Sequence, residues 1–124
     1  MLKKEDVLRY ICRGALDFVY PDGPIHEECI KNGFPGDADQ VPNICKELCG
    51  DGYIYMTTEP VSESWPDVTG WKLTEKGLCT DVFAQALSEA AVEYADMVGR
   101  SVEETKSLIR PNRLKAVLKG ECRI

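Results

Sequence analysis

The sequence lacks long apolar runs and has a single histidine, His26. No run reaches the roughly 18 apolar residues that a transmembrane helix needs. The acidic residues Glu5 and Asp6 come too early in the chain for a secretory signal peptide. We therefore expect a cytoplasmic protein with no membrane contact.

Motifs for catalysis and for metal binding are also missing. A Cys–His nucleophilic pair would need His26 beside an exposed cysteine in a cleft, and the spacing does not indicate one. Cys45 and Cys49 stand at i and i+4 of one predicted helix. Zinc would need further ligands such as His26 or Cys29, and the sequence contains no Cys-x-x-Cys pair. No glycine-rich phosphate loop follows a strand. We expect a non-enzymatic protein with no catalytic residue, metal or cofactor.

The length of 124 residues suits one compact domain, and 44% hydrophobic with 29% charged residues is ordinary for a globular protein. Six cysteines are scattered along the chain. A domain of this size does not need disulfides to fold, so we expect reduced, mostly buried thiols.

The clearest helix signal covers residues 40–49. Asp39 is a candidate N-cap, Pro42 fits the first turn, and Gly50 ends the pattern. One buried face is predicted by apolar residues at i, i+3, i+4 and i+7, which are Val41, Ile44, Cys45 and Leu48.

A β-hairpin is predicted directly after this helix. The turn Asp51-Gly52 leads into a strand over 53–58, rich in β-formers, and a partner strand is predicted over 69–73. The connection at 59–68 contains two prolines and is too long for a tight turn, so it is predicted to protrude as a wing.

Two more helices precede residue 40. A broad apolar stripe predicts a helix over 3–19, which the turn at 20–23 ends. Pro24 fits a first-turn position and Asn32-Gly33 a C-cap, so a short helix is predicted over 24–32.

The chain becomes helical again after Gly77. Helices are predicted over 79–98, 101–110 and 112–119, with a capping box from Ser101 to Glu104. The apolar stripe of the 79–98 helix must be buried. We expect it to pack on the domain or to form a dimer interface.

Together these elements predict a mainly α protein of the α+β class with one small antiparallel hairpin. The order of the elements, and the run Gly70-Trp71-Lys72-Leu73-Thr74-Glu75-Lys76-Gly77 that closes the wing, resemble the winged-helix (winged helix-turn-helix) superfamily of bacterial and phage type. The resemblance covers residues 3–78. It implies a winged-helix domain at 1–78, and the helices predicted after Gly77 then form a helical extension at 79–124. It also implies DNA binding, with the third helix in the major groove and the wing near the minor groove or backbone.

The charges on those two elements oppose that role. Residues 24–51 have a net charge of −4, and the wing carries three acids and no Lys or Arg. Phosphate contacts supply most non-specific affinity for DNA, and a DNA-binding protein normally offers a basic stripe.

One hypothesis is therefore a regulator that binds a protein partner with a basic surface. Trp65, near the tip of the wing, would be its anchor, because tryptophan is enriched among residues that dominate interface energies. The alternative is that its ring folds back beside Tyr53 or Trp71. The candidate partner-binding residues are Asp37, Glu47, Glu63, Trp65 and Asp67.

The second hypothesis is a homodimeric transcription regulator. Gln and Asn can read adenine edges and Lys can reach guanine or phosphate. Residues 100–124 have a net charge of +4, which either supplies phosphate contacts or forms an ordinary solvated helix face. The candidate DNA-binding residues are Gln40, Asn43, Lys46, Arg110, Arg113, Lys115 and Lys119. The small, acidic chain is compatible with a product of a phage or mobile element.

Overall fold

The computed structural model describes residues 2–17, 22–60 and 63–109. These residues are mainly helical and contain a two-stranded antiparallel sheet, so the predicted α+β class is confirmed. The elements in chain order are α1 (Lys4–Ala15), α2 (Glu27–Asn32), the 3₁₀ helix η1 (Ala38–Gln40), α3 (Val41–Gly50), β1 (Ile54–Glu59), β2 (Val68–Leu73), α4 (Glu75–Leu78), α5 (Asp81–Val98) and α6 (Val102–Ile109).

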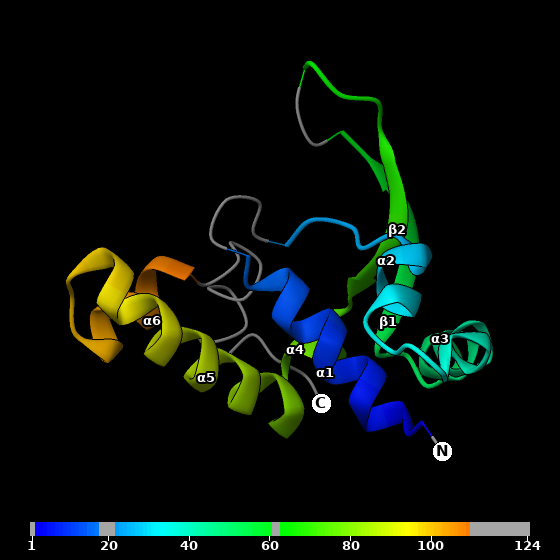
Figure 1. The fold of residues 1–124 in the computed structure, drawn as a ribbon, viewed down its shortest axis with the longest axis horizontal. Coiled ribbons are helices and arrows are strands. Elements are labelled where there is room, and N and C mark those ends of the chain that lie inside the picture. Colours follow the sequence, from blue (N-terminus) through cyan, green and yellow to red (C-terminus); the bar gives the residue numbers. More distant parts are fainter. Residues whose placement is uncertain (1, 18–21, 61–62, 110–124) are drawn as a thin grey trace.

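The hairpin of β1 and β2 projects away from the helices (Figure 1). Ile54 pairs with Leu73 at the base of the hairpin, and Glu59 pairs with Val68 where the wing loop begins. Both strands lie within one residue of the ranges that the sequence predicts.

The chain before α2 is extended, although the sequence predicts a helix over the whole of 24–32. The helix begins only at Glu27. Ile25 instead pairs with Trp71 as an antiparallel bridge, with N···O distances of 3.0 and 2.8 Å. Gly70 permits this approach, because a Cβ there would lie 2.4 Å from the carbonyl group of Ile25. Local periodicity cannot reveal such a pairing, because its partner is distant in sequence.

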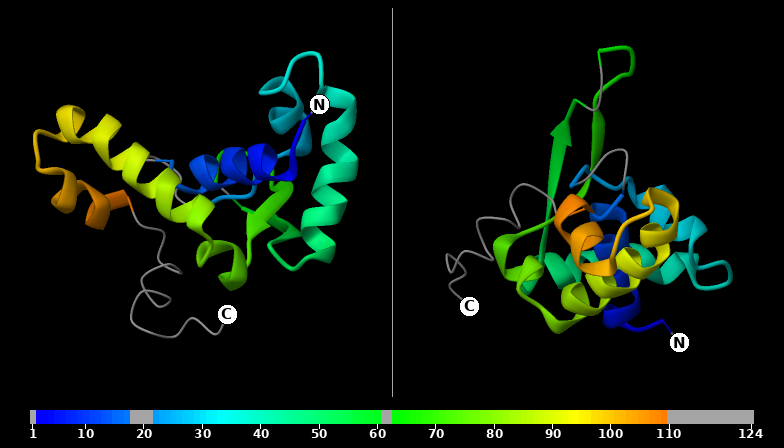
Figure 2. Two further views of the ribbon diagram at one scale, coloured as in Figure 1. Left: turned by 90° about the horizontal axis from the view of Figure 1, so that it is seen from below. Right: turned by 90° about the vertical axis from the view of Figure 1, so that its left-hand side faces the viewer.

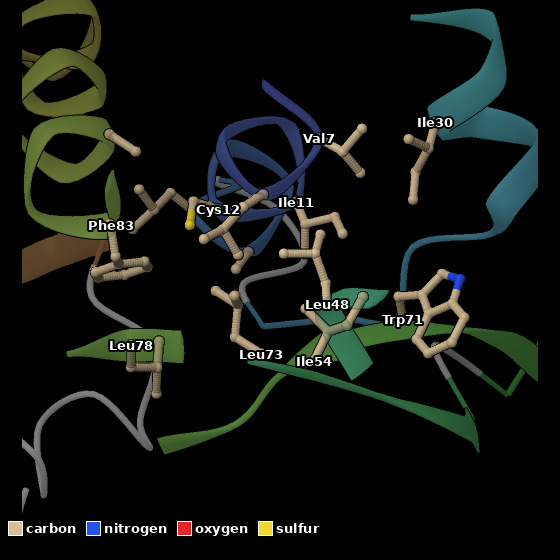
Figure 3. Close-up of a cluster of buried hydrophobic side chains, with 14 of the residues drawn as sticks. Val7, Ile11, Cys12, Ile30, Leu48, Ile54, Trp71, Leu73, Leu78 and Phe83 are labelled. Carbon is tan, nitrogen blue, oxygen red and sulfur yellow. The ribbon is translucent and has the colours of Figure 1, made fainter. Parts of the chain in front are cut away.

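Helix α1 lies at the centre of the hydrophobic core (Figure 3). Ile11 lies toward the hairpin and α3, whereas Cys12 lies toward Phe83 of α5. Val7, Ile11 and Cys12 are fully buried. Burial of each large apolar side chain contributes ~1.5–3 kcal/mol. The other labelled core residues come from the surrounding elements and are Ile30, Leu48, Ile54, Trp71, Leu73 and Leu78.

Helix α5 packs along α1 of the same chain (Figure 2). Its buried face includes Ala86, Ala90 and Ala91, whose small side chains allow the two helices to approach closely. Two surface ion pairs join the helices, Arg9 with Glu89 and Arg13 with Glu93.

The first helix is shorter than the predicted range of 3–19. It ends at Ala15, and the N–H groups of Leu16 and Asp17 bond to carbonyl groups three residues earlier. Such bonds tighten the last turn and lead the chain out of the helix.

Two other local predictions need correction. Asp39, the predicted cap of the third helix, lies within η1, and α3 begins at Val41 with Pro42 in its first turn. The sequence does not predict α4, because one helical turn is too short to show a periodicity. Thr74 caps α4 by accepting a hydrogen bond from Gly77 N–H at 3.1 Å. The predicted helix over 112–119 lies outside the described residues.

The cysteines only partly follow the expectation of reduced, buried thiols. Cys12 and Cys45 are free and buried, whereas Cys29 and Cys49 are free and exposed. Cys79 is disulfide-bonded, contrary to that expectation. No helix in the described part of the chain is long and apolar enough to cross a membrane.

Candidate functional site

The wing carries an exposed tryptophan in acidic surroundings. The side chain of Trp65 is 67% exposed, so the alternative in which its ring folds back on the domain is not observed. Glu63 and Asp67 are exposed on the same loop, and neither forms a salt bridge with another described residue. This part of the wing therefore presents an aromatic ring flanked by unneutralised carboxylates.

A groove with a volume of about 810 Å³ lies between the wing and the body of the protein. Apolar atoms dominate its lining, and its acidic residues are Asp17 and Asp67. None of the described residues that line it is Lys or Arg. The groove is lined by residues from the end of α1, the extended chain before α2 and the wing side of β2, which are Gly14, Asp17, Gly23, Pro24, Ile25, His26, Cys29, Trp65, Pro66, Asp67, Val68 and Thr69.

Buried charges hold the base of the wing in position beside this groove. The Nζ atom of Lys72 lies 3.1 Å from Glu59 Oε1 and 3.6 Å from Asp22 Oδ2, and the Lys72 side chain is only 11% exposed. This ion cluster joins both strands to the chain before α2. A buried lysine needs such partners, because an uncompensated charge in the interior is costly.

His26 and Cys29 lie in the same groove, which their spacing did not indicate. His26 Nδ1 accepts a hydrogen bond from Glu28 N–H at 3.1 Å and so caps α2. The Cys29 N–H donates to the backbone carbonyl of His26 at 2.9 Å, as in a first helical turn, but among the described residues no hydrogen bond joins the Cys29 thiol to the His26 imidazole. The arrangement therefore lacks the nucleophile–base contact of a catalytic pair.

Two of the predicted partner-binding residues lie away from Trp65. Asp37 precedes η1 and accepts a hydrogen bond from Gln40 Nε2 at 3.0 Å. Glu47 is on α3, at the opposite end of the molecule from the wing tip (Figure 1). The structure thus brings together Glu63, Trp65 and Asp67 on the wing, but it does not add Asp37 or Glu47 to that surface.

Lys4 partly neutralises the acidic end of α3. Its Nζ atom lies 3.2 Å from Asp51 Oδ2 and 3.9 Å from Glu47 Oε2. The hydrogen bond with Asp51 raises the pKa of Lys4 above its ordinary value. The acidic charge expected on α3 is therefore weaker than the sequence indicates.

The predicted DNA-reading residues are only partly available. Gln40 is half-buried, and its amide is used internally: Oε1 accepts from Leu2 N–H at 3.1 Å and Nε2 donates to Asp37. These contacts compete with the base reading expected of Gln40, and the sequence gives no sign of the contact with Leu2. Asn43 and Lys46 are exposed on α3, as predicted. The remaining candidates lie outside the described residues and are Arg110, Arg113, Lys115 and Lys119.

Most described cations are already paired with carboxylates. Lys3, Lys46 and Lys76 are the Lys and Arg residues of 2–17, 22–60 and 63–109 that form no salt bridge with another described residue. Lys76 donates to the Asp51 carbonyl at 2.7 Å and lies over the Tyr53 ring. The described surface therefore offers few free cations for phosphate contacts.

The sequence did not predict the groove. The outer side of β2 and the extended segment at Ile25 form its two walls, and only their pairing reveals that they meet. Gly23-Pro24 before Ile25 is the one local sign of an extended chain, since proline and glycine disfavour a helix interior.

The described residues contain no group of three His, Cys, Asp or Glu side chains placed to hold a metal ion. Comparison with protein-family models, curated proteins and solved structures finds no match to this chain.

Proposed function

We propose that this chain is a non-enzymatic winged-helix regulator that acts in a nucleic-acid-related process by binding a protein partner with a basic surface. The observed order of three helices, strand, protruding loop and strand supports the winged-helix assignment. Packing of α1 between the hairpin and α5 joins the base of the hairpin to one hydrophobic core.

The observation that carries the proposal is the exposure of Trp65 between Glu63 and Asp67. An exposed tryptophan supplies a large contact area, and an acidic rim selects a basic surface and repels phosphate. The same loop would face DNA if the protein bound DNA through its wing, and its charge opposes that contact.

A DNA-binding transcription regulator is the second candidate. The exposure of Asn43 and Lys46 on α3 favours it, because both side chains can reach base edges in a major groove. In that case α3 would read the sequence, and the basic residues after 109 would provide phosphate contacts.

We propose a cytoplasmic location. The free thiols of Cys12, Cys29, Cys45 and Cys49 support this location, whereas the disulfide at Cys79 counts against it.

The test compares immobilised wild-type protein with Trp65→Ala, Glu63→Lys/Asp67→Lys and Met97→Ala in retention of proteins from a lysate of the source cells. Met97 is the control, because it is 75% exposed on α5, away from the wing. We expect a protein that the wild type and Met97→Ala retain and that both wing variants lose.

A DNA-binding assay on mixed genomic fragments at about 50 and 200 mM salt distinguishes the protein-binding function from the DNA-binding alternative. Salt-sensitive binding that Lys46→Glu abolishes and Trp65→Ala leaves unchanged would overturn the proposed function. It would identify a DNA-binding regulator instead.

A further inference from the structure

We propose that the partner inserts an extended segment into the groove, where it pairs with the outer edge of β2 and presents Lys or Arg beside bulky apolar side chains. This inference rests on the proposed function and specifies how the wing would recognise its partner.

The hydrogen-bond pattern of the hairpin shows which backbone groups of β2 face the groove. In an antiparallel ladder, hydrogen-bonded pairs alternate with pairs whose N–H and C=O groups point outward. Trp71 directs both its N–H and C=O groups to Ile25, so these backbone groups point away from β1. Thr69 lies two residues from Trp71 on the same strand. Its N–H and C=O groups therefore also point outward, toward the groove.

The groove continues the line of the Ile25 bridge. Ile25 occupies the position beside Trp71, and the chain then turns into α2 at its cap, His26. Among the described residues, no segment pairs with the next position along β2, beside Thr69. An added strand would extend the pairing that Ile25 begins. The pairing could continue as far as Asp67. It would end at Pro66, which has no N–H group to donate to an added strand.

The lining of the groove defines the chemistry of the added segment. Ile25, Val68 and Trp65 offer apolar surface for a bulky side chain, and Asp67 offers a carboxylate. Lys or Arg on the segment would pair with this carboxylate or lie over the Trp65 ring. Since none of the described lining residues is Lys or Arg, an acidic or phosphate-bearing ligand would meet no permanently charged cation here.

The first test selects binders from a random peptide library displayed on phage, with the full chain as the target. We expect the selected peptides to carry Lys or Arg together with bulky apolar residues at alternate positions. Selection of acidic peptides, or of none, would overturn the inference. Competition for the site by a single-stranded oligonucleotide would also overturn it.

The second test compares Thr69→Pro with Thr58→Pro for binding of a selected synthetic peptide. These residues are opposite one another and share a hydroxyl contact of 2.7 Å, so both substitutions remove that contact. Each also removes an outward N–H group, but only that of Thr69 faces the groove. We expect Thr69→Pro to weaken binding at least tenfold and Thr58→Pro to leave it within twofold. Equal affinity of the two variants would contradict edge pairing.

Hydrogen exchange of the wild-type protein provides a readout that does not depend on the folding of either variant. The bound peptide should slow exchange of the Thr69 amide at least tenfold, with no change at Thr58. Unchanged exchange at Thr69 would show that the peptide does not pair with β2. If the natural partner is lost from Trp65→Ala but retained by Thr69→Pro, the inference fails while the proposed function stands. If both variants retain the natural partner and the protein also shows salt-sensitive DNA binding, both the inference and the proposed function fail.

Discussion

Lys72 and Glu59 form a salt bridge across the base of the wing, with Lys72 Nζ 3.1 Å from both carboxylate oxygens. Asp22 approaches the same ammonium group from the chain before α2. One largely buried cation therefore holds three segments together, and its removal would leave two carboxylates facing each other.

We expect Lys72→Met to destabilise the protein by about 2 kcal/mol. The partial exposure of Glu59 keeps this value below the range for a fully buried pair. Urea unfolding measures the change. Lys31→Met is the matched control, because Lys31 pairs with the mostly exposed Glu28 and should cost less than about 1 kcal/mol. Equal losses for the two variants would show that the ion cluster contributes no more than a surface pair.

The glycine beneath the Ile25 bridge provides a second prediction. A Cβ at Gly70 would lie 2.4 Å from backbone atoms of Ile25 and 2.8 Å from His26 N, so Gly70→Ala must displace the bridge. We expect a loss of about 1–3 kcal/mol in the free energy of unfolding. Gly50→Ala, where a Cβ meets nothing within 4 Å in α3, should instead be neutral or stabilise by up to about 1 kcal/mol. A Gly70→Ala protein as stable as the wild type would exclude the close approach.

The packing of α5 on α1 predicts a large effect at Phe83, which is 2% exposed. Phe83→Ala should destabilise the protein by about 3–5 kcal/mol, because it leaves a cavity beside Cys12. Met97→Ala, on an exposed part of the same helix, should change stability by less than about 0.5 kcal/mol. Thermal unfolding of both variants measures this difference. A small effect at Phe83 would mean that α5 is not anchored on α1.

The buried thiols make stability depend on pH. Burial raises the pKa of Cys12 and of Cys45 from 9.0 to about 12. Below about pH 9 both thiols are protonated in the folded and unfolded states. Between pH 9 and 12 the unfolded chain loses these protons first, so stability falls as pH rises through this window.

Unfolding in urea at about pH 8 and pH 10 tests this dependence. Other groups also titrate in this range, so the wild type is compared with Cys12→Ala, which should lose less stability between the two pH values. An identical loss in both proteins would show that Cys12 does not hold its proton in the folded state. In the native protein we also expect Cys29 and Cys49 to react quickly with a thiol reagent, and Cys12 and Cys45 only after unfolding.

The elements formed by neighbouring residues could be predicted from the sequence. The apolar stripe of α3 is buried at Val41, Ile44 and Leu48, as helical spacing predicts. The strands could be predicted as well, because β-forming residues and turn residues lie side by side in the chain.

Contacts between distant residues could not be predicted. The Ile25 bridge and the hydrogen bond from Leu2 to Gln40 join segments far apart in sequence. The first makes the chain before α2 extended, and the second leaves the Gln40 side chain half-buried. The two positions considered for Trp65 differ only in tertiary contacts. Local sequence is the same in both, so the exposure of the ring required the structure.

The bridge between Ile25 and Trp71 has a mechanical consequence. Both of its hydrogen bonds join backbone atoms, so any residue except proline, which has no N–H group, can form them at position 25. A force applied to the wing would pass through β2 into the chain that leads directly into α2. The bridge therefore ties β2 directly to the chain that enters α2, and substitutions other than proline at position 25 can reshape the groove wall while this backbone connection remains.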